Sequence, residues 1–177
     1  MHRDLLLNKI TNILGETSDS LEATLVSMCD DAKRIFITGA GRSKLVGNFL
    51  GMRLMHSGYT VYVQGEISTP SIREGDLLIV ISGSGETTQL VSFTNKAKSE
   101  GAKVVLICSK SSSTIGDLAD QTIQIGSDDS FAPTKGMPMG TMFELSTLIF
   151  LESIVSHLIH EKGIPEEEMR YRHANME

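Results

Sequence analysis

Short apolar runs alternate along the chain with longer segments that have helical spacing, and this alternation limits the fold more than any other feature. The apolar runs cover residues 34–38, 59–63, 76–81, 103–107 and 121–125. Helical patterns separate or follow them at residues 43–57, 87–100, 113–119 and 139–160. Alternating strands and helices favour a parallel sheet covered by helices on both faces. We therefore expect a three-layer αβα sandwich around a five-stranded parallel sheet.

The residues before the first run carry an apolar stripe at helical spacing. The stripe is made by Leu6, Ile10, Ile13, Leu14, Leu21, Leu25 and Met28. This spacing predicts one long amphipathic helix, kinked near Gly15. The 177 residues contain no linker, low-complexity tract or internal repeat, so we expect a single domain over residues 1–177.

Composition limits the partners and the compartment. The net charge of −6 disfavours general binding to nucleic acid, although local basic pockets for small anions remain open. No apolar run approaches the ~20 residues needed to cross a bilayer, and Asn8 and Lys9 interrupt the N-terminal leucines that a signal peptide would need. Cys29 and Cys108 lack metal-ligand spacing and are typical of reduced thiols. We expect a cytoplasmic protein without a membrane or nucleic-acid partner.

Two loops that follow apolar runs have the composition of a phosphate site. Residues 39–43 read GAGRS and residues 82–87 read SGSGET. Both loops lead into a predicted helix N-terminus, whose free N–H groups and dipole favour an anion. Ligands of an open parallel sheet bind beyond the carboxyl ends of the strands. The predicted substrate-binding residues are Gly41, Arg42, Ser43, Ser82, Gly83, Ser84, Gly85, Glu86 and Thr87.

Other interpretations of these loops remain. Either loop alone has about even odds of serving only to cap a helix and close a turn. A nucleoside-triphosphate P-loop is excluded, because neither loop ends in Gly-Lys-Ser/Thr. A dinucleotide-binding fingerprint fits poorly, because Lys44 stands where it has its third glycine. Glu66 matches the acid that binds the ribose in such proteins, so a dinucleotide-dependent enzyme stays a minor alternative. Arg42 is equally well interpreted as a surface cation, and Glu86 is expected to face solvent or complement the helix that follows it.

The two loops resemble the marks of the sugar isomerase (SIS) domain family, Gly-x-Gly-x-Ser and Ser-x-Ser-Gly-x-Thr. Residues 113–120, STIGDLAD, resemble the segment after the family's fourth strand. Within the family the chain is most similar to the 6-phospho-3-hexuloisomerases, at residues 52–58, 138–144 and 172–177. The resemblance implies a flavodoxin-like SIS fold. It also implies interconversion of 3-hexulose 6-phosphate and fructose 6-phosphate through an enediol, with no cofactor and no metal.

Such a reaction needs a base beside the carbonyl carbon, and a partly buried carboxylate suits that task. Glu144 is the predicted base, one turn into a predicted helix. The Thr-x-x-Glu spacing from Thr141 favours a capping box by roughly two to one, and the family resemblance reverses this preference. Glu152 is the reserve candidate, although its apolar neighbours also suggest an interface.

His56 and His173 are candidates to open the sugar ring or donate a proton, because histidine titrates near neutrality. The competing interpretation is a helix C-cap for His56 and a solvated tail residue for His173. The resemblance adds that a histidine often reaches an SIS site from a neighbouring subunit. Both interpretations stay open for each histidine.

The predicted helix at residues 139–160 is apolar on nearly all sides, so it must be buried. We therefore expect a homo-oligomer, a dimer at least and a tetramer by resemblance. Two other functions stay open: an isomerase for a different sugar phosphate, and a sensor that binds sugar phosphate without catalysis.

Overall fold

The computed structural model describes residues 2–132, 136–137 and 139–176. Its five strands form one sheet in the order β2-β1-β3-β4-β5, and every neighbouring pair is parallel. The strands are β1 (Ile35–Gly39), β2 (Val61–Val63), β3 (Leu77–Ile81), β4 (Lys103–Cys108) and β5 (Gln121–Gln124). The predicted α/β sandwich is confirmed.

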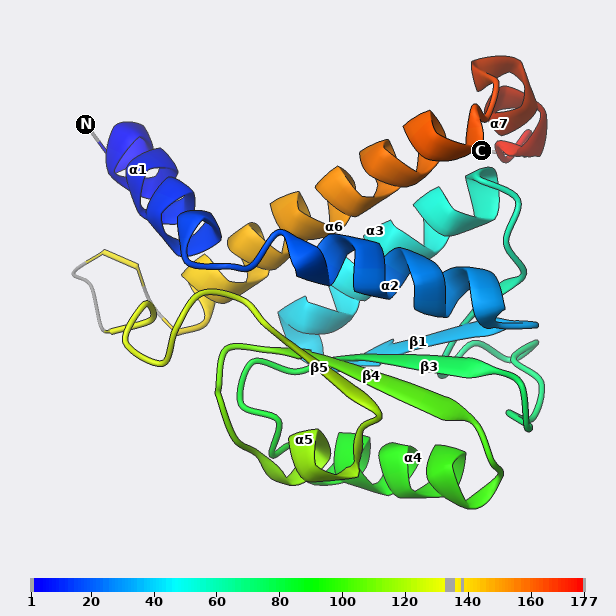
Figure 1. Cartoon of the computed structure of the whole chain (residues 1–177), viewed down its shortest axis with the longest axis horizontal. Helices are drawn as coiled ribbons and strands as arrows, with labels where there is room; N and C mark the ends of the chain where they lie inside the picture. Colours follow the sequence, from blue (N-terminus) through cyan, green and yellow to red (C-terminus); the bar gives the residue numbers. More distant parts are fainter. Residues whose placement is uncertain (1, 133–135, 138, 177) are drawn as a thin grey trace.

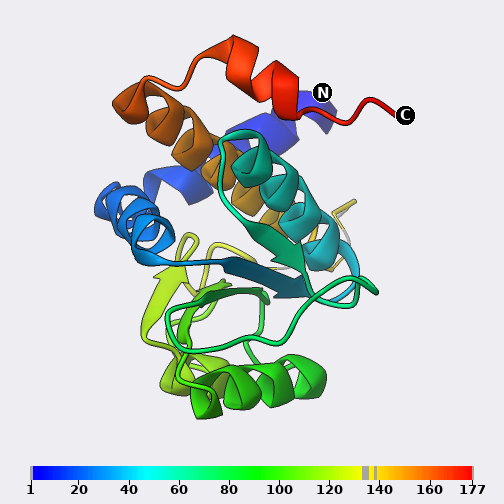
Figure 2. The same cartoon turned by 90° about the vertical axis from the view of Figure 1, so that its right-hand side faces the viewer.

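Helices cover both faces of this sheet (Figures 1 and 2). Below it in Figure 1 lie α4 (Thr88–Ser99) and α5 (Thr114–Leu118), and above it lie α2 (Ser20–Asp31), α3 (Gly41–His56) and α6 (Thr141–Lys162). Successive β3 residues point to opposite faces, as a strand requires. Ile79 belongs to the core under α3 and α6, whereas Val80 belongs to the core under α4 and α5. Burial on both sides explains why β3 is apolar throughout.

The prediction of one long N-terminal helix is wrong. The chain forms α1 (His2–Gly15) and α2, separated by a short connection. Thr17 occupies this break and is buried. Its hydroxyl donates to the carbonyl of Ile13 at 3.1 Å and accepts the amide of Gly126 at 2.9 Å. The apolar stripe continues across the break because both helices pack on α6, so periodicity alone did not reveal it.

Helix α6 is long and apolar, and among the described residues it alone has the length and composition to cross a membrane. Half of its most apolar window is buried inside the protein, where it packs against α1, α2 and α3. A final helix, α7 (Glu166–Arg172), was not predicted. It has no buried residue, and ion pairs between Glu166 and Arg170 and between Glu168 and Arg172 support it.

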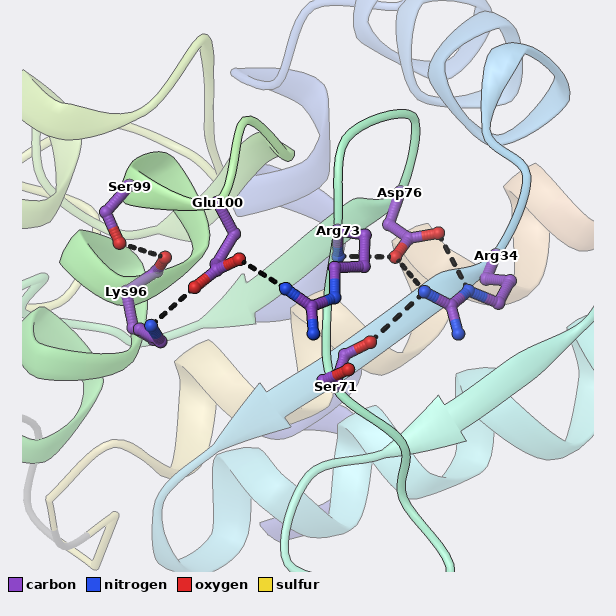
Figure 3. A network of polar contacts seen from close by, with 7 residues as sticks. All are labelled: Arg34, Ser71, Arg73, Asp76, Lys96, Ser99 and Glu100. Atoms are coloured by element: carbon purple, nitrogen blue, oxygen red, sulfur yellow. Dashed lines mark hydrogen bonds and ion pairs between the residues drawn. The ribbon is translucent and has the colours of Figure 1, made fainter.

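A polar network holds the long connection between β2 and β3 at the amino edge of the sheet (Figure 3). Arg34 donates from Nε to Asp76 at 2.9 Å and from Nη2 to the carbonyl of Ser71 at 3.1 Å. Arg73 extends the network to Glu100 on the α4 side, at 2.9 Å. This connection carries the chain across β1, so that β3 pairs with the free side of that strand.

The resulting strand order has its switch point between β1 and β3. The two strands pair in register from Ile35 with Leu77 to Gly39 with Ile81. The polypeptide therefore leaves both strands at the same level of the sheet. Gly39 allows a close turn there, because a Cβ would lie 2.9 Å from the Lys44 amide nitrogen and 3.1 Å from the Ile81 carbonyl oxygen. The two predicted phosphate loops start side by side.

Candidate functional site

A cavity of about 670 Å³ opens at the carboxyl edge of the sheet. Its walls come from the start of α3, the loops after β3 and β4, the segment before α6, and one residue of α1. The described lining residues are Lys9, Ser43, Gly83, Ser84, Ser109, Lys110, Phe131, Ala132, Met137, Met139, Gly140, Thr141, Met142, Phe143 and Glu144. Four predicted site residues are among them: Ser43, Gly83, Ser84 and Glu144.

The first loop is shorter than predicted, because α3 already begins at Gly41. Gly41 has φ +55°, a backbone conformation that is strained for a residue with an L side chain. At this residue the chain turns from β1 into the helix. Ser43 therefore lies in the first helical turn and lines the cavity, next to backbone N–H groups that have no partner within the helix. This arrangement can bind an anion.

The second loop divides into lining residues and supporting residues. Gly83 and Ser84 line the cavity. Ser82 is buried and its hydroxyl accepts the amide of Gly85 at 3.2 Å. Gly85 has φ +66°, and a Cβ there would lie 2.1 Å from the hydroxyl oxygen of Ser113. Ser82 and Gly85 thus shape the loop rather than line the cavity.

Glu86 does not line the cavity and is exposed, as the first of its two expected roles requires, but the helix start that it complements is not the one that follows it. Its carboxylate accepts the amide and the hydroxyl of Thr114 at 2.8 and 2.7 Å, at the start of α5. The hydrogen bonds from Thr114 lower the pKa of Glu86, so this carboxylate stays charged. Thr87 precedes α4 and makes no side-chain capping bond.

Ser109 and Lys110 line the cavity and were missed from the sequence. They follow β4, the neighbour of β3, so the carboxyl-edge argument applies to them as well. Both the amide and the hydroxyl of Ser109 donate to the carbonyl of Gly83, at 3.0 and 2.7 Å. The β4 loop therefore holds the β3 loop in place.

Glu144 lies in the first turn of α6 with only 14% of its side chain exposed. Its Oε2 atom is buried and has no hydrogen-bond partner among the described residues. The guanidinium of Arg42 stands 3.6 Å from this atom. Burial raises the pKa of Glu144, while its own backbone hydrogen bond and the charge of Arg42 oppose the rise. A carboxylate of this kind is suited to accept a proton at neutral pH.

The alternative role of Glu144 in a capping box is not observed. Gly140 is the N-cap residue, with φ +55°, and no side chain caps the helix. A capping box needs the threonine at the N-cap position, but Thr141 is the first residue of the helix itself, one position too late. Gly140 also leaves room for the carboxylate, because a Cβ there would lie 2.6 Å from Oε1 of Glu144.

The reserve candidate Glu152 does not line this cavity. It stands eight residues further along α6, about 12 Å at ~1.5 Å per residue. Its carboxylate pairs with Arg53 on α3 at 3.2 Å. The pair joins two helices, and Glu152 is thereby separated from the loops.

His56 and His173 come together, but away from Glu144. Their rings stack at 5.1 Å between centroids and line a second cavity of about 440 Å³ at the far end of α3. His56 stands 13 residues after Ser43 in α3, a separation of about 20 Å at ~1.5 Å per residue. Within one chain, neither histidine reaches the first cavity.

The described residues contain no group of three or more His, Cys, Asp or Glu side chains that could hold a metal ion. The hydroxyls and helix N-termini of the first cavity are donors, which suit an anion rather than a cation. Fold and site together define an α/β protein that can hold a small anionic ligand beside a buried carboxylate.

Comparison with known proteins identifies the family. The SIS domain model matches residues 28–149, and the chain belongs to the SIS domain family. A 3-hexulose-6-phosphate isomerase of Methylomonas aminofaciens is 49% identical, covering 99% of this chain and 98% of that protein. The 3-hexulose-6-phosphate isomerase of Bacillus subtilis (strain 168) is 39% identical, covering 97% and 95%.

A solved structure from Methanococcus jannaschii has a TM-score of 0.89 and 35% identity, with 99% of each chain covered. That structure was described as inferring a molecular function of 3-hexulose-6-phosphate isomerase. The likeness extends over the whole chain, so it includes α1 and α7 as well as the matched domain.

Substitution of Gly85 by alanine should disrupt the second loop. The new Cβ would meet Ser113 and also strain a backbone at positive φ, so we expect a loss on the order of 2–4 kcal/mol in the free energy of unfolding. Inorganic phosphate should also bind at least tenfold more weakly. Urea unfolding and phosphate titration measure the two effects.

Gly15→Ala is the matched control, since a Cβ there meets nothing within 4 Å. Its phosphate binding should match the wild type, and its stability should rise by about 0.4–1 kcal/mol, because alanine has less conformational entropy to lose on folding than glycine. A Gly85→Ala protein with wild-type stability and phosphate affinity would contradict the role given to this loop.

Proposed function

We propose that this protein is a 3-hexulose-6-phosphate isomerase that interconverts 3-hexulose 6-phosphate and fructose 6-phosphate. The observation that carries the proposal is the buried carboxylate of Glu144, with its raised pKa, in the same cavity as the Ser43 and Ser84 loops. The names of full-length relatives with up to 49% identity support the choice of substrate. A cytoplasmic location stays a prediction.

The phosphate is assigned to the rim between α3 and the β3 loop. Ser43 and Ser84 offer hydroxyl donors, and the α3 N-terminus offers backbone N–H groups and a favourable dipole. Lys110 lies beside this rim, because Ser109 is hydrogen-bonded to Gly83. The rest of the sugar phosphate then extends toward α6.

Glu144 acts as the base. Its carboxylate takes the proton from carbon 2 of 3-hexulose 6-phosphate, and the electron pair of that C–H bond forms the carbon 2–carbon 3 enediolate. The hydroxyl proton on oxygen 2 passes to oxygen 3, and the protonated Glu144 returns its own proton to carbon 3 as the oxygen on carbon 2 becomes the carbonyl, which gives fructose 6-phosphate. Shielding from water keeps the carboxylate basic enough for this exchange.

The direct assay supplies the substrate with hexulose-phosphate synthase, formaldehyde and ribulose 5-phosphate, and measures fructose 6-phosphate. The wild type should produce it, and Glu144→Gln should lower kcat by about 10³-fold, since a general base contributes about 10²–10⁴. Glu152→Gln is the control, because Glu152 lies outside the cavity. A Glu144→Gln enzyme with full turnover would contradict the assignment, and binding of fructose 6-phosphate without turnover by the wild type would favour a sensor.

The pH profile tests the electrostatics of the base. Glu144 must be deprotonated to act, so kcat/KM should fall as pH falls through its pKa, which burial raises above the usual carboxyl value. The charge of Arg42 lowers that pKa. Arg42→Met should therefore move the acidic limb of the profile to higher pH. An acidic limb that stays in place in the Arg42→Met enzyme would contradict the proposed pairing.

We also propose that a second copy covers α3. Leu45, Phe49 and Met52 form a stripe on one face of this helix and are 66%, 51% and 54% exposed. A two-fold axis near Phe49 would pack two copies of α3 antiparallel. The end of the partner's α3, with the stacked pair of His56 and His173, would then lie opposite Arg42. His56 is buried in its own chain, so the exposed ring of His173 is the one that would face the entrance to the Glu144 cavity. Such a dimer supplies the histidine that one chain lacks at its site.

Mixed oligomers test this arrangement. His173→Ala and Glu144→Gln should each be nearly inactive alone, and co-expression with two different tags should yield mixed dimers with one intact site. A random mixture should then show about a quarter of the wild-type specific activity, because about half of the dimers are mixed. Phe49→Asp should give monomers by light scattering and abolish the recovery. Failure of the mixture to exceed the average of its parents would contradict a shared site.

A further inference from the structure

Lys9 lines the cavity but has no role in the phosphate site or in the proton transfer proposed above. It lies on α1, before the residues 28–149 that the SIS model matches. Its side chain lines the same cavity as Glu144. The ammonium donates to the carbonyl of Ala132 at 3.3 Å, on the wall formed by the segment before α6. Lys9 therefore brings a positive charge to the part of the cavity wall formed by the segment before α6.

Helix α1 is fixed to this wall at a second point. The carboxylate of Glu16 accepts the hydroxyls of Ser127 and Ser130, the first at 2.8 Å. Glu16 directly follows the last residue of α1, seven residues after Lys9. One attachment on the helix and one just after its end tie α1 to the segment before α6. These two contacts keep Lys9 at the cavity wall.

The charges of the cavity divide into two groups. Among the described lining residues the cationic side chains are Lys9 and Lys110, and the anionic one is Glu144. Lys110 adjoins the phosphate rim through Ser109 and Gly83. Lys9 comes from α1 and contacts the segment before α6, the direction in which the proposed function extends the rest of the sugar phosphate. The reaction develops negative charge on that part when the enediolate forms, and a fixed donor there lowers the barrier.

We propose that Lys9 is a further catalytic residue, whose ammonium donates a hydrogen bond to the enediolate oxygen of the bound ketose phosphate. This inference rests on the proposed isomerase function. The proton that Glu144 removes stays on Glu144 during this step, and Lys9 stays charged and only stabilises the oxyanion. The donor comes from the N-terminal helix rather than from the phosphate loops.

The test compares three variants of Lys9 in the coupled isomerase assay. Lys9→Met and Lys9→Gln should lower kcat by about 10²-fold, the usual effect of losing one oxyanion donor. Lys9→Arg should recover at least a tenth of the wild-type kcat because it keeps the charge. The inhibition constant for inorganic phosphate should stay within twofold in all three variants. Lys33→Met is the control, since Lys33 is exposed and lies beside Gly75 at the opposite edge of the sheet.

The outcomes separate this inference from the proposed function. An inactive wild type would refute the isomerase function itself. An active wild type with wild-type kcat in Lys9→Met and Lys9→Gln would overturn the role of Lys9 alone. If Lys9 only ties α1 to Ala132, then Lys9→Gln, which keeps a hydrogen-bond donor, should retain activity. Alternatively, a structural role would make phosphate inhibition weaker in the variants that lose kcat. Either result would also overturn the proposal.

Discussion

The parallel pairing of β1 with β3 is the constraint on which the site depends. Because Gly39 is in register with Ile81, the loops after both strands start at the same level and face one cavity. Close contacts leave no room for a Cβ at Gly39 or Gly85, so the two turns have little freedom to separate. Ser43, Ser84 and the α3 N-terminus can therefore act on one anion instead of two.

The proposed reaction also requires a carboxylate that is shielded from water and whose charge is not neutralised by a hydrogen-bonded cation. Glu144 meets this requirement because α6 is a core helix. Its first turn is largely buried, and Glu144 lines the cavity from that turn. Arg42 lies close enough to limit the rise of the Glu144 pKa but makes no hydrogen bond to it within the described residues. A buried acid with a partial counter-charge can exchange a proton near neutrality, whereas a fully paired one cannot. Ligand binding and proton transfer are thus assigned to different elements that meet at one edge.

The sequence predicted the layers of the fold because its strands are buried on both faces and its helices separate them. It also predicted the paired loops, since glycine and hydroxyl residues at strand ends have a direct structural meaning. It missed α7, whose charged residues have no apolar period, and the break at Thr17, which depends on contact with Gly126. The cavity role of Lys9 could not be predicted, because it depends on how α1 packs against a distant segment. Nor could periodicity show that α3 separates His56 from Glu144.

The most direct measurement of the central claim is deuterium exchange into fructose 6-phosphate in D₂O, followed by NMR. A base that forms the carbon 2–carbon 3 enediolate should place deuterium at carbon 3 with the wild type. Glu144→Gln should still bind fructose 6-phosphate, by titration, but exchange no deuterium. Deuterium at carbon 1 would indicate a different sugar-phosphate isomerase, and binding by the wild type without any exchange would contradict catalysis by this cavity.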